Sequence, residues 1–266
     1  MRDINRLRTS RRHMPRVEEC LILAAGNGRR LTSLSGGLPK PLVRIHGQPL
    51  LEHVMLGAYE AGIKRFVIVV GYGADTMRDW FANHRLEGIS VTLVENAEYH
   101  KDNGISVLKA RDYLNGAFLL LMADHIFEAD TARALLNERL RKGEVILAVD
   151  SKLDNIFDLE DVTKLRREGD HIVMIGKEIP EYDAYDTGMF LCSPELFGAL
   201  ESAQKNGDCS LSDGMGILGR SGRLRAFDIG DAFWQDVDTP EALTYAESIF
   251  DHQFCRPAIQ EASIHA

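Results

Sequence analysis

Short, continuous runs of apolar residues alternate along the first half of the chain with segments of helical periodicity. The first run, residues 20–25, ends at a glycine-rich loop and is typical of a strand buried on both faces. Residues 49–62 are typical of a helix, because Pro49 opens the segment and Gly62 closes it. The same reasoning predicts strands at 66–70, 91–94, 118–122 and 145–149, and helices at 74–84, 105–114 and 131–141.

This alternation predicts βαβ units, and therefore an α/β fold with a mainly parallel mixed sheet and helices on both faces. After Asp150 the pattern changes, and residues 162–166 and 171–175 are typical of a hairpin around Gly169. A closing helix begins at Pro240, with Thr239 as its N-cap. Between the hairpin and this helix we predict a strand at 187–192, a helix at 194–204 and a last strand at 224–228.

The chain shows no internal repeat, no low-complexity linker and no clear internal boundary. We therefore predict one domain at residues 20–250, with its ligand-binding lobe in the second half. Residues 1–19 are interpreted as a flexible Arg-rich arm, and residues 251–266 as a C-terminal tail. Contact of the arm with anionic lipid or with another subunit is the alternative interpretation.

Composition narrows the class of protein. The 266 residues carry a net charge of −9, which argues against nucleic acid as a partner, because nucleic-acid binders present a basic face. The four cysteines are scattered, which is typical of a reduced cytoplasmic protein. No apolar run approaches the roughly 18 residues of a membrane span, and residues 1–19 lack the apolar core of a signal peptide. We therefore predict a cytoplasmic protein without a membrane span.

The loop after the first strand carries the strongest chemical signal. Glycines allow a phosphate to approach the backbone closely, and Arg30 and Lys40 add positive charge. A dinucleotide-binding loop would need a third glycine where Leu31 stands, and the Gly-Lys-Ser/Thr of a Walker A loop is absent. The candidate phosphate-binding positions are Ala24, Ala25, Gly26, Asn27 and Gly28.

The run LILAAGNGRRL, followed by LPKPL, resembles the signature of the nucleotidyltransferases that make nucleoside-diphosphate sugars and alcohols. The resemblance covers residues 20–250 and implies a Rossmann-like fold that binds an NTP in its first half and a phosphorylated acceptor in its second. It also implies that the glycine loop holds the NTP phosphates, with Arg30 and Lys40 as the phosphate-binding cations.

Three aspartates are candidate ligands of Mg²⁺. Asp124 follows an apolar strand, which places it at the carboxyl edge of the sheet, although it could instead cap a helix. Alternation places Asp236 and Asp238 on the same side of an extended segment, so both can reach one ion. The resemblance implies a metal aspartate at Asp124 and a second one near Trp234, without deciding between Asp236 and Asp238. Asp238 could merely order the turn into the last helix.

Asn103, Gly104 and Ser106 open a predicted helix, and their polar groups could serve as a helix cap. The resemblance implies that this segment contacts the base and ribose, and that its Asn-Gly-x-Ser pattern is similar to the cytidylyltransferase branch. CTP is therefore the expected donor.

In the second half, the resemblance is to the inositol-1-phosphate cytidylyltransferases. It implies that Lys177 contacts the acceptor phosphate and that Asp186, Thr187 and Gly188 line the acceptor pocket. Residues 210–214 carry the same likeness. The implied reaction transfers CMP from CTP to inositol 1-phosphate and yields CDP-inositol and pyrophosphate. A separate membrane enzyme would then use the product, and a homodimer is left open.

Two other classes of function stay open. Hexose 1-phosphate, phosphocholine or 2-aminoethylphosphonate could be the acceptor, with Tyr182, Tyr185 and Trp234 as candidates for a cage around choline. A non-catalytic nucleotide-binding regulatory subunit is the third possibility. The charged residues at Arg30, Lys40 and Asp124 argue against it, because a subunit without activity has no need of them.

Overall fold

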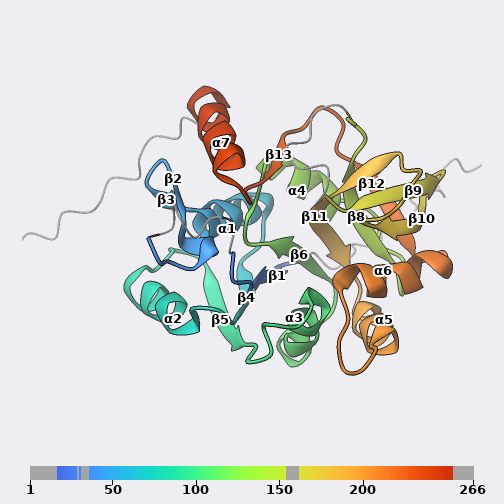
Figure 1. Ribbon diagram of the computed structural model, residues 1–266, viewed down its shortest axis with the longest axis horizontal. Coiled ribbons are helices and arrows are strands. Elements are labelled where there is room, and N and C mark those ends of the chain that lie inside the picture. The colour runs from blue at the N-terminus through green and yellow to red at the C-terminus, as the bar shows by residue number, and fades with distance from the viewer. Residues whose placement is uncertain (1–16, 29, 31–35, 154–161, 254–266) are drawn as a thin grey trace, which may run out of the picture.

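The computed structural model describes residues 17–28, 30, 36–153 and 162–253 (Figure 1). Most of the predicted arm at 1–19 and of the predicted tail at 251–266 lies outside these residues. The first strand begins at Glu19 and the last helix continues to Gln253, so each extends slightly past the predicted boundary of the domain.

A nine-stranded sheet runs through both halves of the chain. Strands β11 and β10 run opposite to the other seven, so the predicted mainly parallel mixed sheet is confirmed. Strand β11 also pairs with β9, which joins β11, β8, β12, β10 and β9 in a closed circuit. The spatial order is β5 (Ser90–Glu95), β4 (Arg65–Val70), β1 (Glu19–Ala24), β6 (Phe118–Met122), β11 (Ala184–Cys192), β8 (Val145–Asp150), β12 (Leu224–Asp228), β10 (His171–Gly176) and β9 (Lys164–Glu168).

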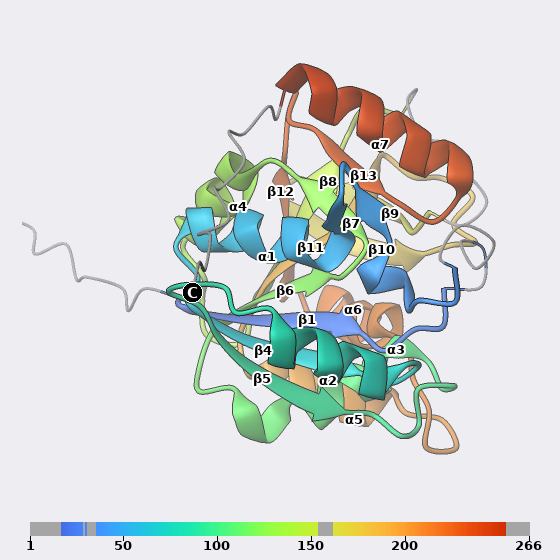
Figure 2. The ribbon, with the colours of Figure 1, turned by 90° about the vertical axis from the view of Figure 1, so that its left-hand side faces the viewer.

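Helices cover both faces of the sheet, as the sequence predicts (Figure 2). Leu21 and Leu23 of β1 pack in one apolar cluster, whereas Cys20 and Ile22 pack in the other, because successive side chains of a strand point to opposite faces. The first cluster includes α3 (Asn103–Lys109), α5 (Glu195–Ala203) and α6 (Leu211–Arg220). The second includes α1 (Leu50–Ala61), α2 (Ala74–Asn83) and α4 (Ala129–Leu136).

Two short strand pairs lie outside the main sheet, and the sequence analysis predicted neither. Strand β7 (His125–Phe127) pairs antiparallel with β13 (Trp234–Asp236), so 224–228 is not the last strand. Strands β2 (Arg44–Ile45) and β3 (Gln48–Pro49) form the second pair, after the 3₁₀ turn η2 (Lys40–Leu42). Helix α7 (Pro240–Gln253) packs beside β13 at one end of the molecule (Figure 2). Its first turn is capped as predicted, because the Ala242 amide donates to Thr239 Oγ1 at 3.2 Å.

Two helices differ by several residues from their predicted ranges, and a third was not predicted. The segment predicted at 105–114 begins earlier, at Asn103, and ends at Lys109 before a 3₁₀ turn, η3 (Arg111–Tyr113). The helix predicted at 131–141 is α4, which ends at Leu136. Helix α6 was not predicted, because its three glycines obscure the helical pattern.

A capping box starts α6 in spite of these glycines. The Asp213 amide donates to Ser210 Oγ at 3.1 Å, and the Ser210 amide donates to the Asp213 carboxylate at 2.9 Å. Each residue therefore satisfies a backbone donor of the other at the start of the helix.

Ser210→Ala is expected to lower the free energy of unfolding by about 1 kcal/mol, because it leaves the N-terminal amides of α6 without this acceptor. Urea denaturation measures the change. Ser202→Ala is the matched control: its hydroxyl donates to the Gly198 carbonyl on the exposed side of α5. It is expected to change stability by less than about 0.5 kcal/mol. Equal losses in the two variants would contradict a role for the cap.

Candidate active site

The glycine loop after β1 lines a cavity of about 280 Å³. Ala24, Gly26, Asn27 and Gly28 contribute to its lining, and Ala25 is buried beside it. Arg30 and Lys40 line the same cavity, so the structure brings the predicted phosphate-binding residues together.

Gly28 fixes the position of Lys40 within this cavity. Gly28 has φ of +53°, and a Cβ atom at this position would collide with the Lys40 side chain. The loop can therefore pack directly on the stem of Lys40, which is only 7% exposed. Pro39 and Pro41 flank Lys40 and restrict its backbone, so the lysine enters the site from a stiff turn.

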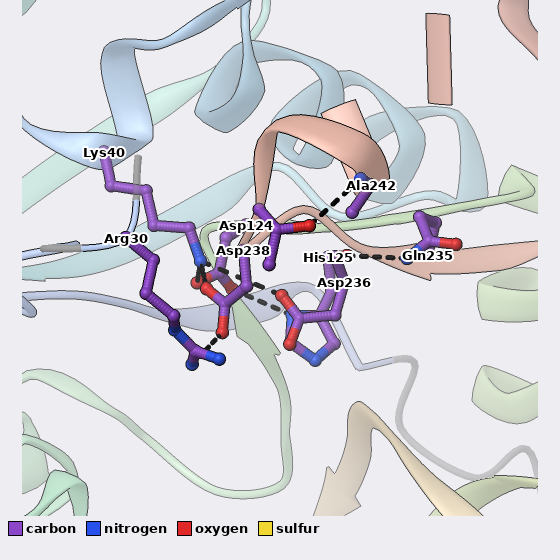
Figure 3. Close-up of polar contacts among 9 residues, drawn as sticks. Arg30, Lys40, Asp124, His125, Gln235, Asp236, Asp238 and Ala242 are labelled. Carbon is purple, nitrogen blue, oxygen red and sulfur yellow. Dashed lines mark hydrogen bonds and ion pairs between the residues drawn. The ribbon is translucent and has the colours of Figure 1, made fainter. Parts of the chain in front are cut away.

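Three carboxylates surround the Lys40 ammonium (Figure 3). Lys40 Nζ lies 2.5 Å from Asp124 Oδ2 and 3.8 Å from Asp236 Oδ1, and it also contacts Asp238 Oδ1. Arg30 Nη2 lies 2.5 Å from Asp238 Oδ2. Asp124 follows β6 at the carboxyl edge of the sheet, and its carbonyl accepts a hydrogen bond from the Val237 amide at 3.0 Å. This backbone contact holds the segment of Asp236 and Asp238 against Asp124.

His125 belongs to the same cluster, and the sequence analysis did not identify it. In the β7–β13 pair His125 stands directly opposite Asp236. Its Nδ1 lies 2.8 Å from Asp124 Oδ1 and 3.7 Å from Asp236 Oδ1. The only signal in the sequence was its position next to Asp124, because the strand that pairs it with Asp236 has only three residues.

Burial and charge oppose each other at these groups. Burial disfavours the ionised form of Asp124, but Lys40 and His125 outweigh it and hold the pKa of Asp124 well below its usual range. Burial also disfavours the charged form of His125, but Asp236 and Asp124 raise the pKa of His125 to about 9. Burial raises the pKa of Asp236. His125 is therefore a cation at neutral pH, and it shares the carboxylates with Lys40.

The donor atoms of Asp124, His125 and Asp236 lie within 4.8 Å of one another, which is compact enough for a metal ion. Although 36% of the Asp236 side chain is exposed, its Oδ1 is buried and accepts no hydrogen bond from the described residues. Carboxylate oxygens are the ligands that Mg²⁺ prefers, whereas a protonated imidazole has no lone pair to give. The residues therefore fit a divalent cation held by the two carboxylates.

A second cavity of about 500 Å³ adjoins the first, and Asp124 and Asp238 line both. Lys177, Asp186 and Gly188, which the sequence analysis assigned to an acceptor pocket, line this second cavity together. The predicted Thr187 lies elsewhere: it is buried, and its hydroxyl donates to the Ala148 carbonyl at 2.8 Å.

Asp186 and Gly188 form an irregular turn within β11 at the wall of this cavity. Burial raises the pKa of Asp186 to about 6, and its Oδ1 accepts a hydrogen bond from the Gly188 amide at 2.7 Å. A Cβ atom at Gly188 would lie 2.6 Å from the His125 ring. Glycine at this position therefore lets β11 approach His125 closely.

The predicted base-contact residues lie at the junction of α3 and α6. Asn103 lines the larger cavity, and its Oδ1 accepts a hydrogen bond from the Leu211 amide at 2.8 Å. Ser106 is buried and accepts from Asn96 Nδ2 at 3.0 Å, while Gly104 packs against Cys209. Among the described residues, none of these three lines the glycine-loop cavity.

The larger cavity includes residues that the sequence analysis did not assign to it: Asp150, Lys152, Asp231 and Phe233 among them. Of the candidate choline cage only Trp234 lines it, within the part of the chain that the structure describes. Tyr185 is fully buried, and its hydroxyl lies 3.4 Å from that of Tyr182. The cage proposed from the sequence is therefore not assembled around the cavity. Across residues 17–28, 30, 36–153 and 162–253, no helix is both long and apolar enough to cross a membrane.

Residues 20–212 match the MobA-like NTP transferase domain. The chain is 36% identical over 231 residues to the bifunctional IPC transferase and DIPP synthase of Rubrobacter xylanophilus, an alignment that covers 86% of the chain and 51% of that relative. The chain thus spans about half the length of this protein. It is also 27% identical over 233 residues to a UTP–glucose-1-phosphate uridylyltransferase of Haloferax volcanii, covering 86% of the chain and 95% of the relative.

The fold also matches a solved structure. The inositol-1-phosphate CTP transferase from T. maritima superimposes with a TM-score of 0.79 at 28% identity, covering 89% of this chain and 96% of that one. The α/β architecture described above is therefore shared with a cytidylyltransferase of known structure.

In the metal-free protein His125 is expected to titrate near pH 9, above its ordinary value of about 6.5. Because the pKa of His125 is higher in the folded than in the unfolded protein, protonated His125 would stabilise the fold. This contribution would be complete below about pH 6.5 and would be lost as the pH rises through 9. NMR of the imidazole in the presence of chelator measures the titration.

Asp236→Asn is expected to lower this pKa, because it removes the carboxylate charge that raises it. An excess of Mg²⁺ should also lower the pKa of His125, because the ion adds positive charge beside the imidazole. A resonance of His125 that titrates near 6.5 in the unmodified, metal-free protein would show that the carboxylates do not retain its proton.

Proposed function

The chain belongs to the family of MobA-like NTP transferase domains, and from this premise we propose that it is a magnesium-dependent cytidylyltransferase. It would transfer CMP from CTP to inositol 1-phosphate, releasing pyrophosphate and CDP-inositol. One observation carries the proposal: the cavity of the glycine loop and the larger cavity meet at Asp124 and Asp238. Two phosphorylated substrates can therefore face each other across the carboxylate cluster.

The reaction needs little covalent chemistry from the protein. A phosphate oxygen of the acceptor attacks the α-phosphorus of CTP, and the bond from that phosphorus to the bridging oxygen of the β-phosphate breaks in line. The bonding pair leaves with pyrophosphate, and no proton has to move. Catalysis then consists of holding the two anions in line and neutralising their charge.

In the first cavity, the glycine loop would receive the phosphates of CTP, with Arg30 and Lys40 as their cations. Both cations contact carboxylates in the structure, Arg30 at Asp238 and Lys40 at Asp124 and Asp238. These carboxylates hold the cations at the position where the two cavities meet. Arg30 would then stabilise the leaving pyrophosphate, and Lys40 the charge around the α-phosphorus.

Asp124 would hold the magnesium ion together with one of the two late aspartates. Of these two we choose Asp236, because its Oδ1 atom is buried and accepts no hydrogen bond from the described residues, whereas both oxygens of Asp238 contact Lys40 or Arg30. When bound, the ion would supply positive charge to the phosphate oxygens of the nucleotide. His125 would keep its proton on Nδ1 and orient Asp124 through their 2.8 Å contact.

In the second cavity, Lys177 would hold the acceptor phosphate, and Asp186 and Gly188 would line the space for its polyol part. Asp150, Asp231 and Ser212 add acidic and hydroxyl groups to the lining, which suit the hydroxyls of an inositol ring. The likeness to the inositol-1-phosphate CTP transferase from T. maritima supports this acceptor. A hexose 1-phosphate is the second candidate, because the chain matches nearly the full length of a UTP–glucose-1-phosphate uridylyltransferase.

Two further parts of the proposal concern the fate of the product and the alternative of a regulatory role. The Rubrobacter relative is bifunctional, and the alignment covers 51% of it, so we infer that a second activity consumes the CDP-inositol made here. A purely regulatory role is disfavoured, because Arg30, Lys40, Asp124 and Lys177 all reach the two cavities.

A pyrophosphate-release assay tests the proposal with four NTPs against inositol 1-phosphate, glucose 1-phosphate, phosphocholine and 2-aminoethylphosphonate. The expected result is that CTP with inositol 1-phosphate gives the highest kcat/KM, and that chelator abolishes turnover. A higher kcat/KM with another acceptor would overturn the inositol assignment but leave the transferase intact. No turnover with any pair would overturn both.

Lys177→Ala is expected to raise the KM for the acceptor by about tenfold or more, because one charged contact to a phosphate contributes roughly 1.5–3 kcal/mol. The KM for CTP should change by less than about twofold, since Lys177 lines only the acceptor cavity. Lys109→Ala is the control: this lysine pairs with Glu98 on the surface of α3. Equal effects on both KM values would show that Lys177 does not discriminate between the substrates.

A further inference from the structure

Asp150, the last residue of β8, is a buried carboxylate in the lining of the larger cavity. Both of its oxygens accept hydrogen bonds. Trp234 Nε1 donates to Oδ2 at 2.7 Å, and the Lys152 amide donates to Oδ1 at 2.8 Å. The Lys152 ammonium lies 2.9 Å from the same Oδ1. Because Asp150 is only 5% exposed, these three donors replace the water contacts that its carboxylate loses on burial.

Trp234 connects Asp150 with the metal-binding carboxylates. Trp234 is the first residue of β13, and Asp236 is the last. Strand β13 pairs only with β7 among the described strands, and this pair lies outside the nine-stranded sheet. Trp234 also stacks on His125, with the ring centres 5.9 Å apart and the planes inclined by 26°. The bond from Trp234 to Asp150 therefore ties the β7–β13 pair to β8 of the main sheet.

Lys152 adds a second tie between the same parts of the structure. Its ammonium donates to the Ala232 carbonyl at 3.3 Å and also to the Gly230 carbonyl. These carbonyls belong to the segment that leads from β12 into β13. Asp150 pairs with Lys152 and holds its ammonium toward that segment. Asp150 thus controls both the entry to β13 and its first side chain.

We propose that Asp150 is a positioning residue: it fixes Trp234 and β13 so that Asp236 faces Asp124 and Trp234 forms a rigid wall of the acceptor cavity. This role rests on the proposed function, in which Asp124 and Asp236 hold the metal ion. In this role, the Trp234 side chain would contact the acceptor, since Trp234, Asp150 and Lys152 all line the larger cavity. It also predicts which kinetic constants depend on Asp150.

Asp150→Asn keeps the shape of the side chain but replaces one acceptor oxygen with a donor group. Either Trp234 or Lys152 then faces an N–H group in place of an oxygen, so Asp150 loses its hydrogen bonds with one of these two residues. Residues that orient metal ligands typically contribute about 10- to 100-fold to metal affinity or activity. We expect kcat to fall about tenfold, and the Mg²⁺ concentration for half-maximal rate and the acceptor KM each to rise at least about threefold. The KM for CTP should stay within about twofold, because Asp150 does not line the glycine-loop cavity.

Trp234→Phe tests the same tie from the other side, because it keeps an aromatic ring but removes the N–H donor. It should shift the Mg²⁺ requirement and the acceptor KM in the same direction as Asp150→Asn. The double variant should be little worse than the more affected single variant, since both changes break one contact.

The matched control is Glu144→Gln. Glu144 immediately precedes the first residue of β8, whereas Asp150 is the last. Its buried carboxylate pairs with Arg225 at 3.3 Å. This variant should lose stability, but it should keep the Mg²⁺ requirement and both KM values of the unmodified enzyme. If Asp150→Asn behaves like Glu144→Gln, Asp150 is merely structural and the inference is wrong.

Fluorescence supplies a readout that does not depend on turnover. The chain has two tryptophans, and Trp80 lies in α2, outside the lining of both cavities. The substitution Trp80→Phe therefore leaves Trp234 as the only tryptophan. In this background, Mg²⁺ and inositol 1-phosphate should each change the emission of Trp234. Adding Asp150→Asn should shift the emission to longer wavelength and weaken both responses. An unchanged spectrum and unchanged titrations would overturn the inference even if the unmodified enzyme proved to be the proposed transferase.

Discussion

The charge balance around Lys40 is the constraint on which the site depends. Asp124, Asp236 and Asp238 converge from two parts of the chain, and like charges this close repel one another unless cations lie between them. Lys40, Arg30 and His125 supply those cations. Lys40 can do so from a buried position only because Gly28 leaves space for its stem.

In the proposed reaction, the carboxylate cluster also determines where the two substrates would meet. Asp124 follows a strand of the parallel part of the sheet, whereas Asp236 and Asp238 come from β13 and the turn after it. The antiparallel pairing of β13 with β7 places Asp236 opposite His125, one residue from Asp124. As a result, the glycine-loop cavity and the larger cavity share Asp124 and Asp238, although most of their other lining residues come from different halves of the chain.

The sequence predicted the parts of this arrangement that depend on local pattern. Strands buried on both faces, such as β1 and β6, read as continuous apolar runs, and the charged residues Arg30, Lys40 and Asp124 stand beside them. The parts that depend on distant pairing were not predictable. Strand β7 has three residues, and the bond from Trp234 to Asp150 joins positions 84 residues apart. Helix α6 was missed because its glycines outweigh the capping box at Ser210.

If the protein binds nucleotide and metal ion as proposed, this charge balance would couple the binding of one to the binding of the other. In the free protein Asp124 and Asp238 take two of the three donors of the Lys40 ammonium, so the phosphates of a nucleotide would compete with these carboxylates for its positive charge. If the lysine turns to the phosphates, Asp124 and Asp236 lose a neighbouring positive charge, and a divalent ion is then favoured between them. Asp124 and Asp236, when they hold a divalent ion, would likewise attract the Lys40 ammonium less strongly and leave it available to the phosphates at the glycine loop. Each event therefore favours the other, and the carboxylates that organise the cations in the free protein become the ligands of the ion in the proposed complex.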